Sequence, residues 1–313
     1  METIFLPWVP KNKIKWFDLC RNENAITLLE KNLDKVYWNV LSNNENAISI
    51  LEKNLEKVYW DNLCLNRNAV PILENNQNKI NWSLLSYNEN AISLLERNID
   101  KIDWRSLSTN INAIHLFENN WEKIDWYNLS GNINAINLLD ANEEFIHWYC
   151  LSSNKNARHL LESNKKSIDW DQLSSNPSMI QLLDENQEKI NWDILSSNPM
   201  AISILNNNIN KINWYELSYN YNAISLLEEN VDKINWISLP YNPNPKVIHL
   251  LESNQDKIDW DTLYRNTNIF QCDYHFYDQK MNILREDLMK NVFHPVRFIK
   301  NLEKHNYNIF DGF

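Results

Sequence analysis

The sequence predicts an all-α protein, an α-solenoid of about eleven to twelve 22-residue repeats with two helices in each. The first observation is that Trp recurs every 22 residues from Trp16 to Trp236, and once more at Trp260. The second is that Leu follows each of these twelve Trp by three positions and Asn follows it by six. The third is that apolar residues within each repeat lie three and four apart, which is helical spacing.

The predicted elements follow in order along the chain. Residues 1–12, with Phe5 and Trp8 ahead of Pro10, are expected to form an N-terminal cap, and residues 13–268 the solenoid. In each repeat, Trp-x-x-Leu-Ser predicts a first short helix and Ala-Ile-x-Leu-Leu-Glu a second. Helices this short are stable only when they stack on neighbours, so we expect an elongated curved rod with the Trp side chains in its core.

Asn supplies the predicted helix boundaries. The Asn after Leu-Leu-Glu, as at Asn32 and Asn54, stands where a helix needs a left-handed stop. The first Asn between the two helices is expected to cap the second helix. Pro71 conflicts with that boundary unless the cap is the later Asn68, so the start of the second helix stays open by two residues.

Residues 269–313 are not repetitive and predict a helical C-terminal cap, with helices at Gln279–Lys290 and Pro295–Lys304. The alternative fold is a leucine-rich-repeat-like horseshoe, because 22 residues falls within that repeat length. The repeats lack the Leu-x-Leu strand core of that fold, and Ala-Ile-x-Leu-Leu-Glu is a poor strand.

Composition excludes several function classes. With only two Gly, Gly131 and Gly312, the chain has no Gly-rich nucleotide-binding loop. A net charge of −11 makes nucleic acid an unlikely partner. The sequence has neither a signal-peptide pattern nor an apolar run long enough for a membrane span, and its four Cys are scattered, so we expect a reducing cytosolic compartment and no membrane.

The residues predict neither catalysis nor a cofactor, and we therefore expect a protein that is not an enzyme. His115, His159 and His249 occupy equivalent repeat positions, but the first two are roughly 18–20 Å apart by helix spacing, too far to share a metal ion. We assign no metal ligands, although whether Cys272 and His275 bind a metal stays open, with His294 and His305 following. The repeated Glu is expected to pair with Lys35 and its equivalents.

The variable surface positions predict a protein–protein interaction scaffold that binds a viral or host protein on its curved surface. Tyr is common in protein interfaces, and it recurs one and five residues after the repeated Trp and at one hinge. We expect four of these Tyr, in two adjacent repeats, to form one patch. The alternatives are a modular single-stranded RNA-binding repeat protein and a horseshoe binding module. The candidate partner-binding residues are Tyr87, Tyr127, Tyr149, Tyr215, Tyr219, Tyr221 and Tyr241.

The repeat array, opened by Leu6-Pro7-Trp8-Val9-Pro10-Lys11 and closed by the segment Leu288–Arg297, resembles the short-repeat proteins encoded by giant DNA viruses of the Mimivirus type. The resemblance covers nearly the whole chain. It implies a viral protein of the host cytoplasm or viral factory, with association with the virion as a further option. It carries over a fold and no catalytic residue, and it identifies no partner.

Overall fold

The computed structural model describes residues 3–291, 297, 299–300 and 304. By its internal contacts the chain divides into a repeat unit, residues 5–269, and a second unit of residues 1–4 and 270–313. We number the repeats 1 to 12 by their Trp, from Trp16 to Trp260.

The first helix of a repeat begins at its Trp. Only repeat 11 lacks an α-helix there, and a 3₁₀ turn, Leu239–Tyr241, stands in its place. The first helices are α1 (Trp16–Leu19), α3 (Trp38–Leu41), α5 (Trp60–Leu65), α7 (Trp82–Ser86), α9 (Trp104–Leu107), α10 (Trp126–Gly131), α12 (Trp148–Ser152), α14 (Trp170–Ser174), α16 (Trp192–Ser197), α18 (Trp214–Tyr219) and α21 (Trp260–Leu263).

The second helix of most repeats begins at the Ile of Ala-Ile. In repeat 5 it is a 3₁₀ helix, Ile114–Phe117, and repeat 12 has only the 3₁₀ turn Thr267–Ile269. The others are α2 (Ile26–Glu30), α4 (Ile48–Glu52), α6 (Val70–Glu74), α8 (Ile92–Glu96), α11 (Ile136–Asp140), α13 (Arg158–Ser163), α15 (Ile180–Asp184), α17 (Ile202–Asn206), α19 (Ile224–Glu229) and α20 (Val247–Ser253).

Short 3₁₀ turns connect these helices and settle the open boundary. In repeat 3 the side chain of Asn66 caps the turn Arg67–Ala69, and α6 then begins at Val70 with Pro71 in its first turn, where no hydrogen bond is lost. The turns that lead to the next Trp are Leu33–Lys35, Leu55–Lys57, Gln77–Lys79, Ile99–Lys101, Trp121–Lys123, Glu143–Phe145, Lys165–Ser167, Gln187–Lys189, Ile209–Lys211 and Val231–Lys233.

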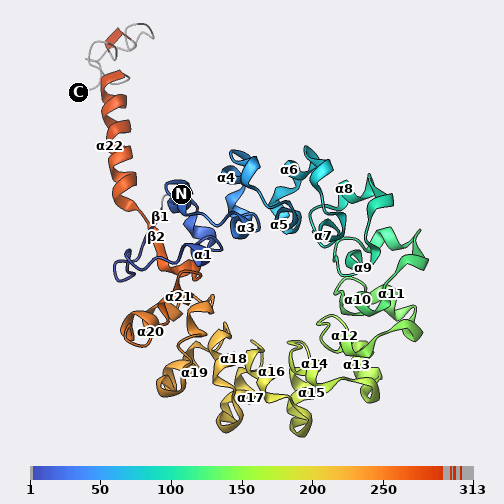
Figure 1. The fold of residues 1–313 in the computed structure, drawn as a ribbon. Coiled ribbons are helices and arrows are strands. Elements are labelled where there is room, and N and C mark those ends of the chain that lie inside the picture. The colour runs from blue at the N-terminus through green and yellow to red at the C-terminus, as the bar shows by residue number, and fades with distance from the viewer. Residues whose placement is uncertain (1–2, 292–296, 298, 301–303, 305–313) are drawn as a thin grey trace. The chain divides into compact units, whose positions relative to one another are not determined.

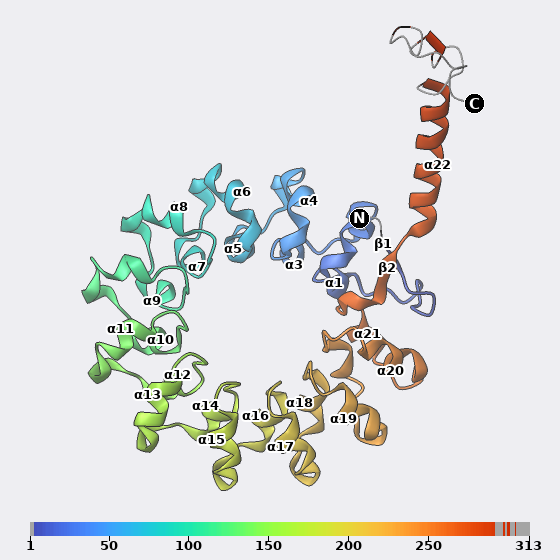
Figure 2. The same ribbon diagram turned by 180° about the vertical axis from the view of Figure 1, so that it is seen from behind.

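The repeat unit is a closed ring (Figure 1 and Figure 2), with the first helices on the inside and the second helices on the outside. Repeat 12 contacts repeat 1 directly. Nδ2 of Asn22 donates hydrogen bonds to the carbonyl oxygens of Tyr264 and Asn266, at 3.0 and 2.9 Å. The backbone N–H of Leu6 donates to the carbonyl of Ile269 at 2.8 Å. The α-solenoid is confirmed, but the open rod is wrong, because the two ends of the solenoid bond to each other.

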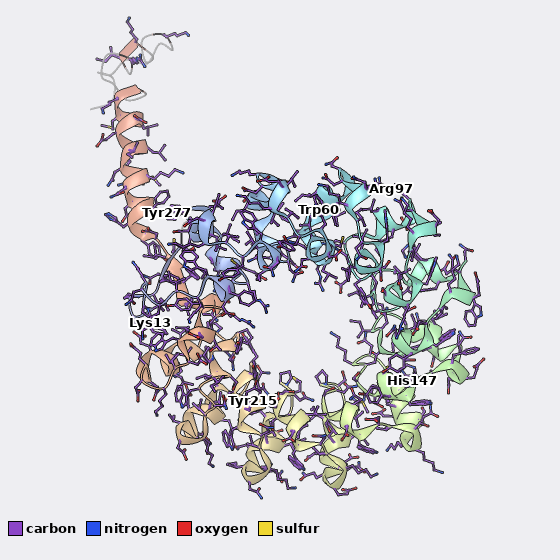
Figure 3. The ribbon with its side chains drawn as sticks, in the orientation of Figure 1. Lys13, Trp60, Arg97, His147, Tyr215 and Tyr277 are labelled. Carbon is purple, nitrogen blue, oxygen red and sulfur yellow. The ribbon has the colours of Figure 1, made fainter. Side chains whose placement is uncertain are left out.

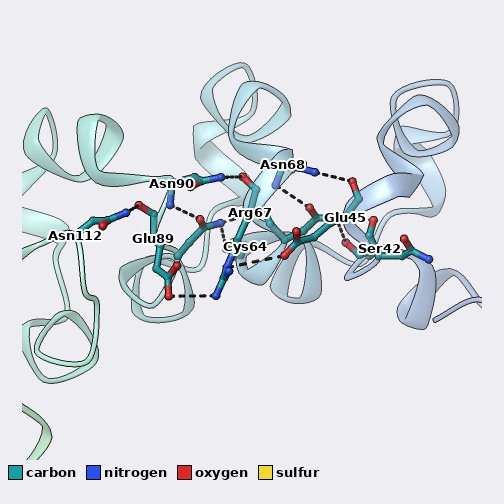
Figure 4. Close-up of polar contacts among 11 residues, drawn as sticks. Ser42, Glu45, Cys64, Arg67, Asn68, Glu89, Asn90 and Asn112 are labelled. Atoms are coloured by element: carbon teal, nitrogen blue, oxygen red, sulfur yellow. Dashed lines mark hydrogen bonds and ion pairs between the residues drawn. The ribbon is translucent and has the colours of Figure 1, made fainter. Parts of the chain in front are cut away.

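One buried Asn per repeat joins each repeat to the one before it. The Asn six residues after each Trp is at most 5% exposed in all twelve repeats. In Asn132, Nδ2 donates to the carbonyls of Ser108 and Asn110, both at 3.1 Å, and Oδ1 accepts from the N–H of Asn134. A second Asn two residues later bonds to the preceding repeat in most cases, as Asn68 does to the Glu45 carbonyl (Figure 4).

The core between the inner and outer helices is aliphatic. The Leu three residues after each Trp is fully buried in every repeat, as are most of the Ala residues that precede the outer helices. The twelve repeated Trp are only half-buried, so the prediction that they form the core is wrong. A Lys amino group lies over the ring of ten of them, at 4.2–5.3 Å from the centroid. This leaves Lys35 and its equivalents over Trp rings rather than paired with Glu.

The Asn after Leu-Leu-Glu ends the outer helix in a different way from the one predicted. Asn32 and Asn54 have φ of −139° and −137°, so neither is left-handed. Instead, Nδ2 of each donates to the carbonyl four residues earlier, at 2.9 and 2.8 Å. The side-chain amide thereby satisfies a carbonyl that the end of the helix leaves free.

Strands β1 (Thr3–Phe5) and β2 (Phe270–Cys272) form a two-stranded sheet, and Phe5 is the one residue of the two strands that belongs to the repeat unit. In the second unit, α22 (Tyr274–Asn291) includes the predicted helix Gln279–Lys290. Most of the other predicted helix, residues 295–304, lies outside the described residues. Among the residues that are described, these are the only strands, and neither lies inside a repeat, so the horseshoe alternative is wrong. No described helix is both long and apolar enough to cross a membrane.

Candidate protein-binding surface

Six of the seven predicted Tyr lie in or directly after the first helix or turn of a repeat, on the inner side of the ring, and Tyr221 lies in the turn that follows α18. Each inner helix buries its Leu completely, and neighbouring inner helices lie side by side around the ring, as α10 does with α12. Residues one and five after the Trp point away from that Leu and so face the opening of the ring. Tyr215, one residue after Trp214, lies on the inner helix α18 (Figure 3).

Three of the four Tyr predicted to form a patch are in ring contact. Tyr215 and Tyr219 meet edge-on with centroids 5.4 Å apart and hydroxyl oxygens 3.2 Å apart. Tyr219 stacks on Tyr241 of the next repeat at 5.5 Å and 23°. The guanidinium of Arg265 lies over the other ring in this stack, 5.2 Å from the centroid of Tyr241. We call Tyr215, Tyr219, Tyr241 and Arg265 the tyrosine cluster.

The cluster is partly preorganised. Tyr215 is 45% exposed, whereas Tyr219 and Tyr241 are half-buried between repeats. Burial, followed by the hydrogen bond to Tyr215, raises the pKa of Tyr219 well above its usual value, so this phenol is neutral at physiological pH. Rings held by their neighbours lose little side-chain entropy when a partner binds.

The other predicted Tyr lie apart from the cluster. Tyr221 is 50% exposed and contacts none of the cluster rings within the described residues. Tyr87 is 45% exposed at the end of α7, likewise away from the cluster. Tyr127 and Tyr149 flank the imidazole of His147, with centroids 4.5 and 6.5 Å from it. The seven candidates therefore occupy at least three separate sites on the ring.

A depression of about 450 Å³ lies beside Tyr149. Thr109, Gly131 and Ser153, each five residues after its Trp, supply the small side chains that leave it open. A Cβ at Gly131 would lie 3.8 Å from the Cβ of Cys150, an ordinary contact, so this Gly leaves room in the depression and is not required by the backbone.

Carboxylates outnumber cations on the inner helices. We call the residue before each Trp and the residues one, two and five after it the inner positions. Their carboxylates, all exposed or half-buried, are Asp18, Asp61, Asp103, Asp125, Asp169, Asp171, Asp193, Glu216, Asp259 and Asp261. Their basic residues are Lys15, Arg21, Arg105 and Arg265. At positions one and five alone, which face the opening of the ring, the count is four carboxylates against three basic groups, so most of the excess comes from the residue before each Trp and the residue two after it. The balance over all the inner positions is acidic, which disfavours phosphate backbones and favours a basic polypeptide.

The repeated His and Glu residues pair across repeats on the outer helices. His115 lies 2.8 Å from Glu96, and His159 lies 3.0 Å from Asp140, in each case a carboxylate of the preceding repeat. His249 pairs with Glu228 in the same way, at 2.8 Å. Lys and Arg also fill this role, as Lys53 does with Glu30 and Arg97 with Glu74.

No group of three or more potential metal ligands occurs among the described residues. The ring of His275 contacts Gln279, at 2.8 Å between the two Nε2 atoms. His294 and His305 lie outside the part of the chain that the structure describes.

Three residues of potential binding surfaces were not identified from the sequence: Arg265, Trp121 and Phe145. Each either breaks the repeat pattern or follows a residue that does, and that is the signal by which they could have been found. Trp121 is out of phase with the repeated Trp, and Phe145 stands where ten repeats have a Lys over the Trp ring. Arg265 follows Tyr264, which replaces the small buried residue found there in the other repeats.

Comparisons with protein-family models, with curated proteins and with solved structures found no match to this chain.

Proposed function

We propose that the protein is a non-enzymatic, ring-shaped interaction scaffold that binds a basic segment of a partner protein on its inner surface. The observation that carries this proposal is the tyrosine cluster, in which the exposed Tyr215 meets Tyr219 edge-on, Tyr219 stacks on Tyr241, and Arg265 lies over Tyr241. Tyr and Arg are the side chains that most often dominate binding energy at protein interfaces.

Charge supports a basic partner over a nucleic acid. The inner positions carry ten carboxylates against four basic groups, and two of the ten, Glu216 and Asp193, lie in repeat 10 and the repeat before it, close in the chain to the cluster. A basic segment gains from this field, whereas single-stranded RNA needs a basic groove for its phosphates.

The place of action rests on the sequence resemblance alone. We propose a viral protein that acts in the cytoplasm or viral factory of an infected host cell and binds a viral or host protein there.

The test compares two pairs of substitutions. Tyr215→Ala with Tyr219→Ala removes the exposed half of the cluster, and Tyr37→Ala with Tyr59→Ala removes two other Tyr, 49% and 56% exposed, in repeats 1 and 2. Quantitative mass spectrometry of proteins captured from infected cells identifies the partner, and its Kd is then measured with purified components. We expect the first pair to weaken binding more than tenfold and the second pair to leave it nearly unchanged.

Two outcomes would contradict the proposal. One is equal loss of binding with both pairs, which would mean that the cluster is not the interface. The other is salt-sensitive retention of single-stranded RNA by the wild-type protein, which would favour the RNA-binding alternative.

A further inference from the structure

The contact between Lys and Trp is a repeated binding geometry of this ring. The Lys that covers a Trp stands three residues before the next Trp, as Lys101 does for Trp82, with its Nζ 4.6 Å from the ring centroid. In several repeats the same Nζ also donates to an Asn Oδ1, as Lys101 does to Asn98 at 3.0 Å. The repeats thus show how this scaffold holds a cation, with an aromatic face on one side and an oxygen acceptor on the other.

Repeat 6 departs from this pattern and exposes aromatic surface. Phe145 replaces the Lys and stacks on Trp126 with centroids 4.8 Å apart and an angle of 18°. Trp121, from the preceding 3₁₀ turn, meets both rings edge-on, at 4.9 Å from Trp126 and 5.9 Å from Phe145. Trp121 is 42% exposed and Phe145 is 43% exposed. We call these three residues the aromatic triad.

Carboxylates without a cation flank the triad. Glu122 follows Trp121, and Glu143 and Glu144 precede Phe145, all three exposed. None of the three forms an ion pair within the described residues. The one Lys in these two turns, Lys123, is held over Trp104 at 4.5 Å. An exposed aromatic face beside unpaired carboxylates is the environment that favours a guanidinium or ammonium group.

We propose that the aromatic triad, with Glu122, Glu143 and Glu144, binds an arginine- or lysine-bearing segment of a partner protein. The outer face of Phe145 receives the cation, and the carboxylates supply its acceptors. Phe145 fills the place over Trp126 that a Lys fills over Trp in other repeats, so the partner's cation lies on the aromatic face that Phe145 adds there. The proposal does not depend on the tyrosine cluster, which lies four repeats further along the chain.

Charge also decides against a second copy of this chain as the occupant. A symmetric contact through the triad would bring the carboxylates of two copies together, and like charges at a contact oppose association. A basic segment reverses the sign of that interaction.

The experiment uses the full chain and defined peptides. The probe is an acetylated and amidated peptide of alternating Gly and Arg, and the control peptide has citrulline in place of Arg, which keeps the shape and removes the charge. Binding is measured by isothermal titration calorimetry and by NMR of the Trp indole N–H groups. We expect the Arg peptide to bind with a Kd of about 1 mM or tighter and the citrulline peptide about tenfold more weakly.

The decisive variant is Phe145→Lys, which restores the residue found at this position in most repeats and should therefore fold normally. It should weaken binding of the Arg peptide about tenfold or more. Tyr37→Lys makes the same change of charge at an exposed aromatic residue in another part of the ring, and it should leave the Kd within about twofold. The pair Glu143→Gln with Glu144→Gln should weaken binding and reduce its dependence on salt.

Three results would overturn the proposal. The wild-type protein and Phe145→Lys could bind the Arg peptide equally, or the wild-type protein could bind both peptides equally. The third is no binding of the Arg peptide at a peptide concentration tenfold above the expected Kd of about 1 mM. Self-association that Phe145→Lys abolishes would assign the surface to a second copy instead. Tyr215→Ala with Tyr219→Ala should not change the peptide Kd, so a failure here is separate from a failure of the proposed scaffold function.

Discussion

The contacts between successive repeats and the contact that closes the ring use the same hydrogen bonds but differ in connectivity. Inside the ring, Asn132 bonds to two carbonyls of the preceding repeat, and the chain also passes through that contact. At the closure, Asn22 makes the equivalent two bonds to repeat 12, and no peptide bond joins the two sides. The closing contact is therefore the one place where the ring can open while every helix stays intact.

The closing contact has interactions that compensate for this. Arg265 bonds to Asp18 at 2.5 Å, with both side chains less than one-third exposed, and Lys15 pairs with Asp261 at 3.0 Å. The hydroxyl of the fully buried Tyr264 donates to the carbonyl of Pro10 at 2.6 Å. A buried phenol and a partly buried ion pair add noncovalent strength where chain continuity is missing.

The largest expected effect comes from an internal Asn. Asn132→Ala removes three hydrogen bonds, the two that Nδ2 donates to the carbonyls of Ser108 and Asn110 and the one that Oδ1 accepts from the N–H of Asn134. We therefore expect the free energy of unfolding to fall by about 2–4 kcal/mol. Urea unfolding followed by circular dichroism measures this loss.

Asn22→Ala is the matched change at the closure. We expect it to open the ring, seen as a larger radius of gyration in solution scattering, with a smaller loss of free energy of unfolding than Asn132→Ala. Equal losses without any change in radius would mean that the closing contact is no weaker than the internal ones.

The sequence predicted the repeat but not the ring, and the physical reason is curvature. Twelve repeats close when each turns by about 30°, a rotation that side-chain packing sets and that the spacing of Trp and Leu does not reveal. Repeat 1 does contain sequence features that indicate a closed ring. Asn22 would have no carbonyl partner in an open rod, and Lys13 stands three residues before Trp16 as if a repeat preceded it. In the ring, Lys13 lies over Trp260 at 5.3 Å.

The candidate surface was predicted in part for the same reason. Positions one and five after each Trp were expected to be exposed, and Tyr87, Tyr127, Tyr149 and Tyr215 are. Which rings touch depends on the angle between repeats, so the stack of Tyr219 on Tyr241 could not be predicted from spacing alone. The burial of the repeated Trp was overestimated. Periodicity shows that a position is equivalent in every repeat, but it does not show which side chains cover that position in the folded protein.

The next largest expected effect is that the ring opens at alkaline pH, when Tyr264 loses its proton. Burial raises the pKa of Tyr264 to about 12, against about 10 in an unfolded chain. Since the folded pKa is the higher one, the contribution of Tyr264 is complete below about pH 10 and is lost as the pH rises towards 12. The change over this interval is about 2–3 kcal/mol.

Resonance energy transfer between labels at Asn12 and Asp256, on the two sides of the closing contact, measures this opening. The variant Tyr264→Phe lacks both the hydroxyl and the titration, so its transfer efficiency should not change with pH in the same interval. An identical pH profile in both proteins would assign the alkaline opening to another group, of which Tyr219 is the first to test because its pKa is also raised.

The smallest expected effect compares two Lys over Trp rings. Lys13 lies over Trp260 across the closing contact, and Lys101 lies over Trp82 inside the ring. Replacing either with Ala removes one cation–π contact at an exposed site, about 0.5 kcal/mol. Because the closing contact can open locally, Lys13→Ala should increase the open population about twofold in the energy-transfer assay, whereas Lys101→Ala should leave that population unchanged and lower only the urea midpoint. If both variants opened the ring equally, strain would be shared around all twelve contacts, and the closing contact would not open independently of the others.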